Sequence, residues 1–273
     1  VKDYGKGTGT MTWDKTKTYV LDGFVFINDG QTLTIPAGTI VKGKSGQGEN
    51  ASALIVARGG KLMAEGTATE PIIFTAEADG IRYDHQAGAV ETADNIPATT
   101  RGLWGGIIVL GKGETNNTTT NKAIEGIPTT EPRGQYGGTA NDDNSGSLKY
   151  FSIRFGGTDI GEGNEINGLT FGACGNGTTI EHGEIIANKD DGIEWFGSTV
   201  MCKWMLVAFC GDDAIDYDQA FRGHGQFWCV VQDPNAGDRI GEHDGGPSDN
   251  EFGTPYAIPT IYNVTYIGRG TTE

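Results

Sequence analysis

Two short segments rich in aspartate and glutamate repeat each other in the second half of the chain. The segment "NKDDGIEWFG" spans residues 188–197, and "CGDDAIDYDQ" spans residues 210–219, at an offset of 22 residues. A third copy, "DRIGEHD" at residues 238–244, follows after a further 26 residues. Acids that recur in this way bind a cation, perform acid–base catalysis or face water in turns.

The spacing of the acids predicts a metal site. Within each copy the apolar and acidic residues alternate as in a strand with one buried face, so the isoleucines point inward and the acids outward. Carboxylates of successive copies then form columns, which are unfavourable unless water, protons or cations compensate them. We expect Ca²⁺ between the copies, bound by carboxylate and backbone oxygens. The candidate ligands are Asp190, Asp191, Asp212, Asp213, Glu194, Asp216, Asp218 and Glu242.

An interpretation without a metal also fits these residues. Turn aspartates hydrogen-bond the local backbone in many proteins, and the outward acids would then face water. The chain contains no EF-hand loop, so the calcium hypothesis depends on the geometry that the repeat implies.

A third hypothesis is that the same acids are catalytic residues. Glycoside hydrolases need two carboxylates about 5 to 9.5 Å apart, and the candidates are Glu194, Asp216, Asp218 and Glu242. A polysaccharide lyase would add a cation and a base, for which Arg222, Arg239 and Lys189 are the basic residues near the acids, and His224 in the segment "GHG" is a further catalytic candidate. No spacing marks any of these residues as a base.

The composition indicates an all-β protein and excludes some partners. The chain of 273 residues contains 45 glycines, and its formal net charge is −16. Such a charge repels nucleic acid phosphates, and no apolar run approaches the ~20 residues of a membrane helix. We therefore expect neither a nucleic acid partner nor a membrane span. The first residues lack the regions of a signal peptide, so the chain is either cytosolic or already processed.

Four cysteines lie within 56 residues and lack the spacing of a zinc site. They therefore favour disulfides and an oxidising compartment. Cys202 and Cys229 occupy nearly equivalent positions of successive copies, which favours a bridge between them. Cys174 with Cys210 is then the remaining pair, although four cysteines allow three connectivities.

The repeat predicts one architecture. Copies of 22 to 32 residues with two or three short strands each fit one turn of a β-solenoid. We expect a single domain over residues 1–273, with a lead-in at residues 1–18 and loop-rich insertions at residues 80–146. Long loops on a rigid scaffold are common places for function.

The runs "GQTLTIPAGTIVKG", "ALIVARGGKLMAEGTATEPIIFTA", "GLWGGIIVLGKG" and "GTTIEHGEIIANKDDGIEWFGSTV" resemble a known family. They are similar to secreted bacterial right-handed parallel β-helix proteins of pectin-lyase-like architecture. The resemblance implies an all-β parallel β-helix and export, after removal of a signal that this sequence does not contain. In such a helix, Trp195, Tyr217 and His243 would form one inward ladder.

The last run, "IPTIYNVTYIGRGTTE", is strand-like and has no amphipathic helix after it. Either the natural protein continues beyond this run, or a second copy stacks on the uncapped β-helix end and builds a fibre, and we expect self-association through open ends. The sequence favours a non-enzymatic extracellular or cell-surface structural or adhesive protein. The alternative is a carbohydrate-active enzyme or a polysaccharide-binding module.

Overall fold

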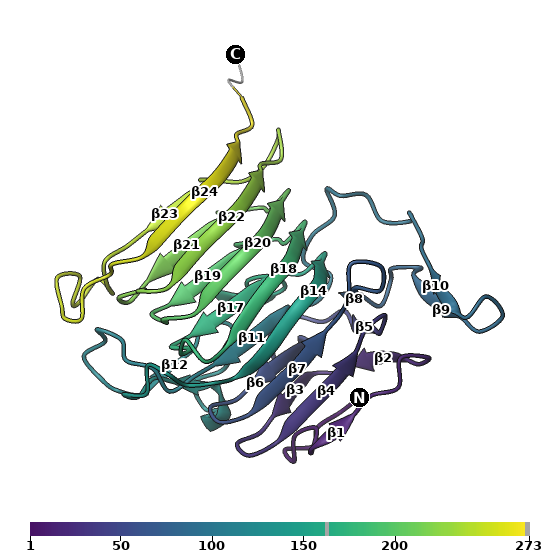
Figure 1. The fold of residues 1–273 in the computed structure, drawn as a ribbon, viewed down its shortest axis with the longest axis horizontal. Helices are drawn as coiled ribbons and strands as arrows, with labels where there is room; N and C mark the ends of the chain where they lie inside the picture. The colour runs from purple at the N-terminus through teal and green to yellow at the C-terminus, as the bar shows by residue number, and fades with distance from the viewer. Residues whose placement is uncertain (162–163, 271–273) are drawn as a thin grey trace.

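The chain winds into a parallel β-helix whose coils stack along one axis (Figure 1). The structure is a computed structural model that describes residues 1–161 and 164–270. One sheet has seven short parallel strands: β3 (Phe24–Ile27), β6 (Ala53–Val56), β11 (Ile107–Leu110), β17 (Leu169–Gly172), β19 (Ile193–Phe196), β21 (Ile215–Asp218) and β23 (Gly241–His243). The predicted all-β parallel β-helix with long inserted loops is confirmed.

A second sheet of eleven strands covers the other side of the coils. Its long path runs through β1 (Met11–Thr12), β4 (Thr32–Pro36), β7 (Lys61–Glu65), β14 (Gly146–Arg154), β18 (Thr179–Ile186), β20 (Met201–Ala208), β22 (His224–Val231) and β24 (Thr260–Ile267). Three further strands belong to this sheet: β2 (Thr18–Leu21), β5 (Ile40–Gly43) and β8 (Ile72–Ala76). The strand β8 pairs with the second half of β14, β5 pairs with β8, and β2 pairs with β5. Each long strand therefore contains two segments that were separate strands in the first coils.

The two halves of the long strands meet at one residue with left-handed backbone geometry. These residues are Tyr150, His182, Trp204, Phe227 and Asn263, with φ between 47° and 58°. Left-handed geometry is unfavourable for residues other than glycine. Ring stacking offsets this cost, since the ring centroids of Tyr150 and His182 are 4.2 Å apart and those of His182 and Trp204 4.4 Å.

The interior of the coils is filled by ladders of apolar side chains. Ile193 lies opposite Ile215, and Trp195 lies opposite Tyr217, which in turn lies opposite His243, as the repeat predicts. Trp195 is fully buried and stacks on Trp228 with centroids 5.4 Å apart. These inward ladders fix the direction of the acidic side chains between them.

Inserted segments cover the outer face of the seven-stranded sheet. One carries β12 (Lys122–Ala123), the 3₁₀ helix η2 (Pro132–Gly134) and β13 (Gln135–Tyr136), and another carries β15 (Asp159–Gly161) and β16 (Asn164–Glu165). Ile124, Ile127, Tyr136 and Ile166 from these segments pack on outward residues of the sheet such as Ile108. A further insertion forms the hairpin of β9 (Arg82–Asp84) and β10 (Ala89–Glu91) on the eleven-stranded sheet, and a short 3₁₀ helix, η1 (Gly48–Asn50), precedes β6. The regular strand β11 lies within the predicted range 80–146 and separates two of these insertions.

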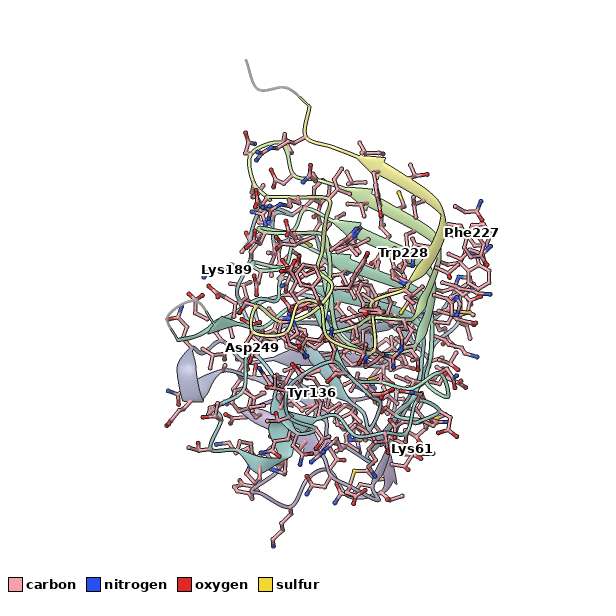
Figure 2. The ribbon with its side chains drawn as sticks, turned by 90° about the vertical axis from the view of Figure 1, so that its left-hand side faces the viewer. Lys61, Tyr136, Lys189, Phe227, Trp228 and Asp249 are labelled. Atoms are coloured by element: carbon pink, nitrogen blue, oxygen red, sulfur yellow. The ribbon has the colours of Figure 1, made fainter. Side chains whose placement is uncertain are left out.

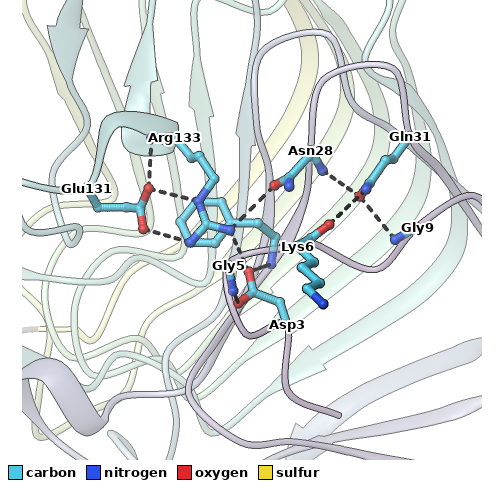
Figure 3. Close-up of polar contacts among 9 residues, drawn as sticks. Asp3, Gly5, Lys6, Gly9, Asn28, Gln31, Glu131 and Arg133 are labelled. Carbon is cyan, nitrogen blue, oxygen red and sulfur yellow. Dashed lines mark hydrogen bonds and ion pairs between the residues drawn. The ribbon is translucent and has the colours of Figure 1, made fainter.

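The N-terminal segment covers the first strand of the seven-stranded sheet. The N–H of Thr8 donates to the carbonyl of Phe26 at 2.8 Å. Arg133 holds this segment in place, because its guanidinium pairs with Asp3 at 2.7 Å and lies over the ring of Phe26 at 3.9 Å (Figure 3). Glu131 binds the same guanidinium with both carboxylate oxygens. The lead-in is thus a cap, which differs from the expectation of two open ends.

The strand β24 forms the last coil of the solenoid that the structure describes. The strand β24 pairs with β22 along one edge, and among the described residues no strand pairs with its other edge. Val264 and Tyr266 continue the inward ladders of Trp228 and Val230, yet each is 40% exposed. Within the described residues, the apolar ladders are therefore partly exposed at β24.

The predicted disulfides are not formed. All four cysteines, each of which the structure describes, are free thiols. Cys202 points into the core opposite Gly225, whereas Cys229 lies on the outer face of its strand opposite Leu206. Side chains on opposite faces of a sheet cannot bridge. Burial raises the pKa of Cys210 to about 12 and leaves it an unreactive thiol.

The described part of the chain has no helix long and apolar enough to cross a membrane.

Candidate functional site

The acids of the repeat belong to one outward column of the seven-stranded sheet. From the first coil to the last, the column contains Phe26, Ile55, Ile108, Thr170, Glu194, Asp216 and Glu242. The inserted segments cover its apolar members, and the acids follow in the later coils. The predicted register of Glu194, Asp216 and Glu242 is confirmed.

The burial of this column differs from the sequence expectation. Glu194 points outward from the coil but is only 6% exposed, and Asp191 in the preceding turn is 8% exposed. The insertion that carries β16 places Asn167 against Glu194, whose Oε2 accepts a hydrogen bond from the Asn167 amide. Glu194, which alternation directs toward water, is therefore enclosed, whereas Asp216 in the next coil is only partly buried.

The aspartates of the turns bind the backbone of the next coil. Oδ1 of Asp191 accepts the N–H of Asp213 at 2.9 Å, and Oδ1 of Asp213 accepts the N–H of Arg239. For Asp191 and Asp213 the partner lies one coil further along, whereas Asp218 accepts the N–H of the next residue, Gln219, as the expectation of local hydrogen bonds has it. Asp191 and Asp213 each help to hold two coils in register.

Three groups of acids bring one oxygen per residue within 4.8 Å of the others. They are Asp190 with Asp191 and Asp212, Asp191 with Glu194 and Asp216, and Asp212 with Asp213 and Asp238. Six of the eight predicted metal ligands thus lie in groups that fit a cation, together with Asp238, while Asp218 and Glu242 lie outside them. We call the second group the buried group and the third the exposed group.

The two groups differ in how their charge is balanced. Arg239 occupies the position in the third repeat that Asp191 and Asp213 occupy in the first two. Its guanidinium lies 3.8 Å from Asp213, 3.0 Å from Asp238 and 2.9 Å from Glu242, so it neutralises part of the exposed group. Within residues 1–161 and 164–270, no lysine or arginine forms an ion pair with an acid of the buried group.

The pKa values of the buried group are raised. Burial, together with neighbouring carboxylates, raises the pKa of Asp191 to about 9 and that of Asp216 to about 7. The pKa of Glu194 is raised well above its usual value for the same reasons, burial first and Asp216 second. Close carboxylates without a countercharge favour the protonated form. At neutral pH this group therefore holds protons unless a cation replaces them.

Sequence reasoning missed the residues that the insertions contribute. Asn167 touches the buried group, and Glu125 and Glu165 lie close enough to raise the pKa of Glu194 and of Asp190, respectively. Asn167 follows the "GNE" stretch of a loop, and no pattern in the sequence connects it with Glu194. A contact between an insertion and a coil has no periodicity to reveal it.

Five of the candidate catalytic residues do not converge on one place. Glu194 and Asp216 are adjacent, and Asp218 lies two residues further along β21 with Oδ1 bound to the N–H of Gln219. Arg222 pairs with Glu114 at 3.6 Å, and His224 begins β22 in the other sheet. These three acids are therefore brought together without Arg222 and His224.

The buried group suits a hard cation. Carboxylate and amide oxygens are the ligands of Ca²⁺ and Mg²⁺, and Ca²⁺ accepts six to eight of them in irregular geometry. Softer metals such as zinc prefer cysteine and histidine, neither of which belongs to these groups. The arrangement is thus able to hold Ca²⁺ between coils.

Comparison with known proteins agrees with the observed architecture. A family model described as a pectate-lyase-like β-helix domain matches residues 5–273. The chain has no significant match among curated proteins or among solved structures.

Proposed function

The chain belongs to the family of pectate-lyase-like β-helix domains, and we propose that it is a non-enzymatic structural or adhesive module outside the cell or on its surface. The burial of Glu194 supports this proposal most directly, since a hydrolase needs its carboxylates open to a polymer. Regular ladders along the whole solenoid fit a scaffold, in which each coil is stabilised by its neighbours. Export is part of the proposal and is supported by the resemblance to secreted β-helix proteins.

Calcium is the proposed stabilising ion. Carboxylates in adjacent coils repel one another when they are charged, and a cation between them turns this repulsion into a link between coils. An ion that binds the folded form alone raises its stability in proportion to the logarithm of its concentration. Removal of Ca²⁺ is therefore expected to lower the melting temperature of the protein.

Self-association is proposed for the C-terminal end. This end exposes the edge of β24 and the inward-facing Val264 and Tyr266, whereas residues 1–10 cover the N-terminal end. An edge strand with apolar neighbours is a template for pairing with another chain. The edge of β24 and these apolar side chains support contact between two copies through the C-terminal end of the solenoid.

A groove on the eleven-stranded sheet supports a second candidate function, polysaccharide binding. A cavity of about 390 Å³ lies beside Tyr150, His182, Trp204 and Phe227, with Arg154 and Glu184 among its lining residues. Phe227 points away from the solenoid, whereas its neighbour Trp228 points into it (Figure 2). Exposed aromatic and charged groups in one groove can recognise a sugar by apolar contact and hydrogen bonds.

The stacked rings do not by themselves form a sugar platform. Tyr150, His182 and Trp204 lie nearly parallel, with interplanar angles of 3°, so each inner ring has both faces covered by its neighbours. Sugars stack on ring faces, and mainly ring edges remain open along this ladder. The structural role therefore stays the leading proposal.

A cleavage screen tests the leading proposal. The purified protein is incubated with acidic and neutral polysaccharides, with Ca²⁺ and after chelation, while product ends and melting temperature are measured. We expect no cleavage under either condition and a lower melting temperature after chelation. Cleavage by the natural protein that is lost in Asp216→Asn and Asp218→Asn would instead establish an enzyme.

A further inference from the structure

We infer that Asp191, Glu194, Asp216 and Asn167 form one enclosed Ca²⁺ site, which links two coils to the insertion that carries Asn167. This inference rests on the proposed calcium stabilisation and names the place where the ion binds. It also separates that place from the exposed group around Asp238, which the sequence pattern does not distinguish from it.

The distances between the acids fit a single ion. One oxygen of each acid in the buried group lies within 4.8 Å of the other two. Calcium binds oxygens at about 2.3–2.6 Å, so two ligands on opposite sides of one ion are up to about 5 Å apart. The three oxygens can therefore contact the same cation without a change in the coil spacing.

Asn167 gives independent support for a ligand at this position. Its side chain reaches Glu194 through the amide nitrogen, and the residue is 2% exposed. Its Oδ1 is buried and has no hydrogen-bond partner in the part of the chain that the structure describes. A buried polar atom without a partner is costly, and a cation beside Glu194 would satisfy it.

Asp216 shows the same deficiency from the opposite side of the group. Its Oδ1 is buried and, within the described residues, has no hydrogen-bond partner. The oxygens of Asp216 and Asn167 thus both lack partners beside the same carboxylate, that of Glu194. One ion would provide the missing partner for both.

The charge of the group identifies the ligand as a cation. Three carboxylates meet here with no ion pair from a described lysine or arginine, whereas Arg239 serves that purpose in the exposed group. The chain therefore provides its own cation at one group and none at the other. An external divalent cation would complete the buried group.

The ligand set favours Ca²⁺ over Mg²⁺. Mg²⁺ needs near-ideal octahedral geometry at about 2.0–2.1 Å and usually keeps several waters. The buried group is fixed by the register of β19 and β21 and by an insertion, so its oxygens have little freedom to contract. Ca²⁺ accepts longer and less regular bonds.

The first experiment measures calcium stoichiometry and affinity by calorimetry on chelated, dialysed protein. The variants are Glu194→Gln and Asn167→Ala in the buried group, with Asp238→Asn in the exposed group as the matched control. We expect Glu194→Gln to weaken binding at least 100-fold, Asn167→Ala to weaken it about 10-fold and Asp238→Asn to change it less than 3-fold. Mg²⁺ alone is expected to bind at least 100-fold more weakly than Ca²⁺.

A second readout keeps the inference testable if one variant folds poorly. Without Ca²⁺, Glu194→Gln is expected to melt at a higher temperature than the natural protein, because glutamine buries no ionisable carboxyl group among the other acids. With Ca²⁺ the order reverses, since the variant loses the ion. A residue with a purely structural role would not produce this reversal, and Asp216→Asn is a second variant expected to show it.

Two outcomes would overturn the inference. If Asp238→Asn abolishes Ca²⁺ binding while Glu194→Gln retains it, calcium stabilisation holds but the site is the exposed group. If the chelated protein binds no Ca²⁺ and shows no change in melting temperature, the calcium claims both fail. The structural role is judged separately by the cleavage screen.

Discussion

Asp191 combines two roles that usually belong to different residues. Its carboxylate accepts the N–H of Asp213 in the next coil and also lies in the buried group with Glu194 and Asp216. The hydrogen bond favours the charged form, while burial and the neighbouring acids favour the protonated form and prevail. The site therefore responds to protons as well as to cations.

This balance predicts an unusual dependence of stability on pH in the chelated protein. An unfolded aspartate has a pKa of about 3.9, whereas Asp190 and Asp216 have pKa values of about 7 in the folded chain. Between these values the folded form binds more protons, so the free energy of unfolding falls as pH rises. We expect the melting temperature to fall by several degrees from pH 5 to pH 8.

Calorimetric melting at constant ionic strength, with and without Ca²⁺, checks this prediction. Saturating Ca²⁺ should flatten the fall, since the ion replaces the protons. The matched variant Asp216→Asn should show a smaller fall without Ca²⁺. A melting temperature that rises from pH 5 to pH 8 in the chelated natural protein would contradict the prediction.

At the scale of the element, the position between the two halves of each long strand sets what the sequence can place there. Trp204 adopts φ of 54° and is sandwiched between His182 and Phe227. Asparagine tolerates this left-handed geometry, as Asn263 does at the end of the ladder, whereas a β-branched residue does not. The ladder therefore depends on backbone tolerance as well as on ring stacking.

Substitutions at Trp204 separate these two contributions. Both Trp204→Asn and Trp204→Val remove the ring, so the loss of stacking is shared. The valine variant also forces a β-branched residue into left-handed geometry and should be less stable than the asparagine variant by ~1–2 kcal/mol. Urea unfolding of the two variants measures this difference. Equal stabilities would show that the backbone at residue 204 leaves the left-handed geometry in the valine variant.

The sequence predicts the coils well and their cover poorly. The offset of 22 residues between Asp190 and Asp212 gives the number of residues in that coil, and with it the register of β19 on β21, because equivalent positions of adjacent coils become neighbours. The insertion that carries Asn167 repeats nothing, so its packing depends on shape alone. For this reason the register of Glu194 was predictable and its burial was not.

The disulfide prediction failed for a related reason. Cys202 and Cys229 lie near equivalent positions in the repeat, but the pairing of β20 with β22 sets them on opposite faces of the sheet. Gly225, opposite Cys202, lies four residues before Cys229, and the left-handed residue Phe227 between them interrupts the alternation of the strand. Approximate equivalence in the sequence is therefore insufficient for a side-chain contact.

At the scale of the whole molecule, the two ends of the solenoid have different chemistry. The N-terminal cap depends on Arg133, which contacts Asp3, Glu131 and the ring of Phe26. Arg133→Ala should lower stability by roughly 2–3 kcal/mol, since it leaves the largely buried carboxylate of Asp3 with its backbone hydrogen bonds but without its positively charged partner. Arg133→Lys should recover part of this loss, because it keeps the charge but not the two-pronged contact with Glu131.

Hydrogen exchange locates the effect of this substitution. The amide of Thr8, bound to the carbonyl of Phe26, should exchange faster in Arg133→Ala, whereas the amide of Ile193 in the middle of the solenoid should be unchanged. Faster exchange throughout the chain would mean that the cap is part of the global folding unit.

The difference between the ends limits the assemblies that the proposed self-association can build. If the open edge of β24 is the one adhesive end, two copies can pair there around a twofold axis, and growth then stops. The formal net charge of −16 opposes this pairing, and salt screens such repulsion over about 10 Å at 0.1 M. Sedimentation velocity should therefore show a monomer at low salt and a dimer, without longer species, as the salt concentration rises.

Tyr266→Lys should keep the protein monomeric, since it places a charge in the apolar end, while Arg58→Ala on the side of the solenoid serves as the matched control. Removal of residues 1–10 uncovers the N-terminal end and should convert the dimers into longer chains. Fibres formed by the intact protein would show instead that the N-terminal cap opens.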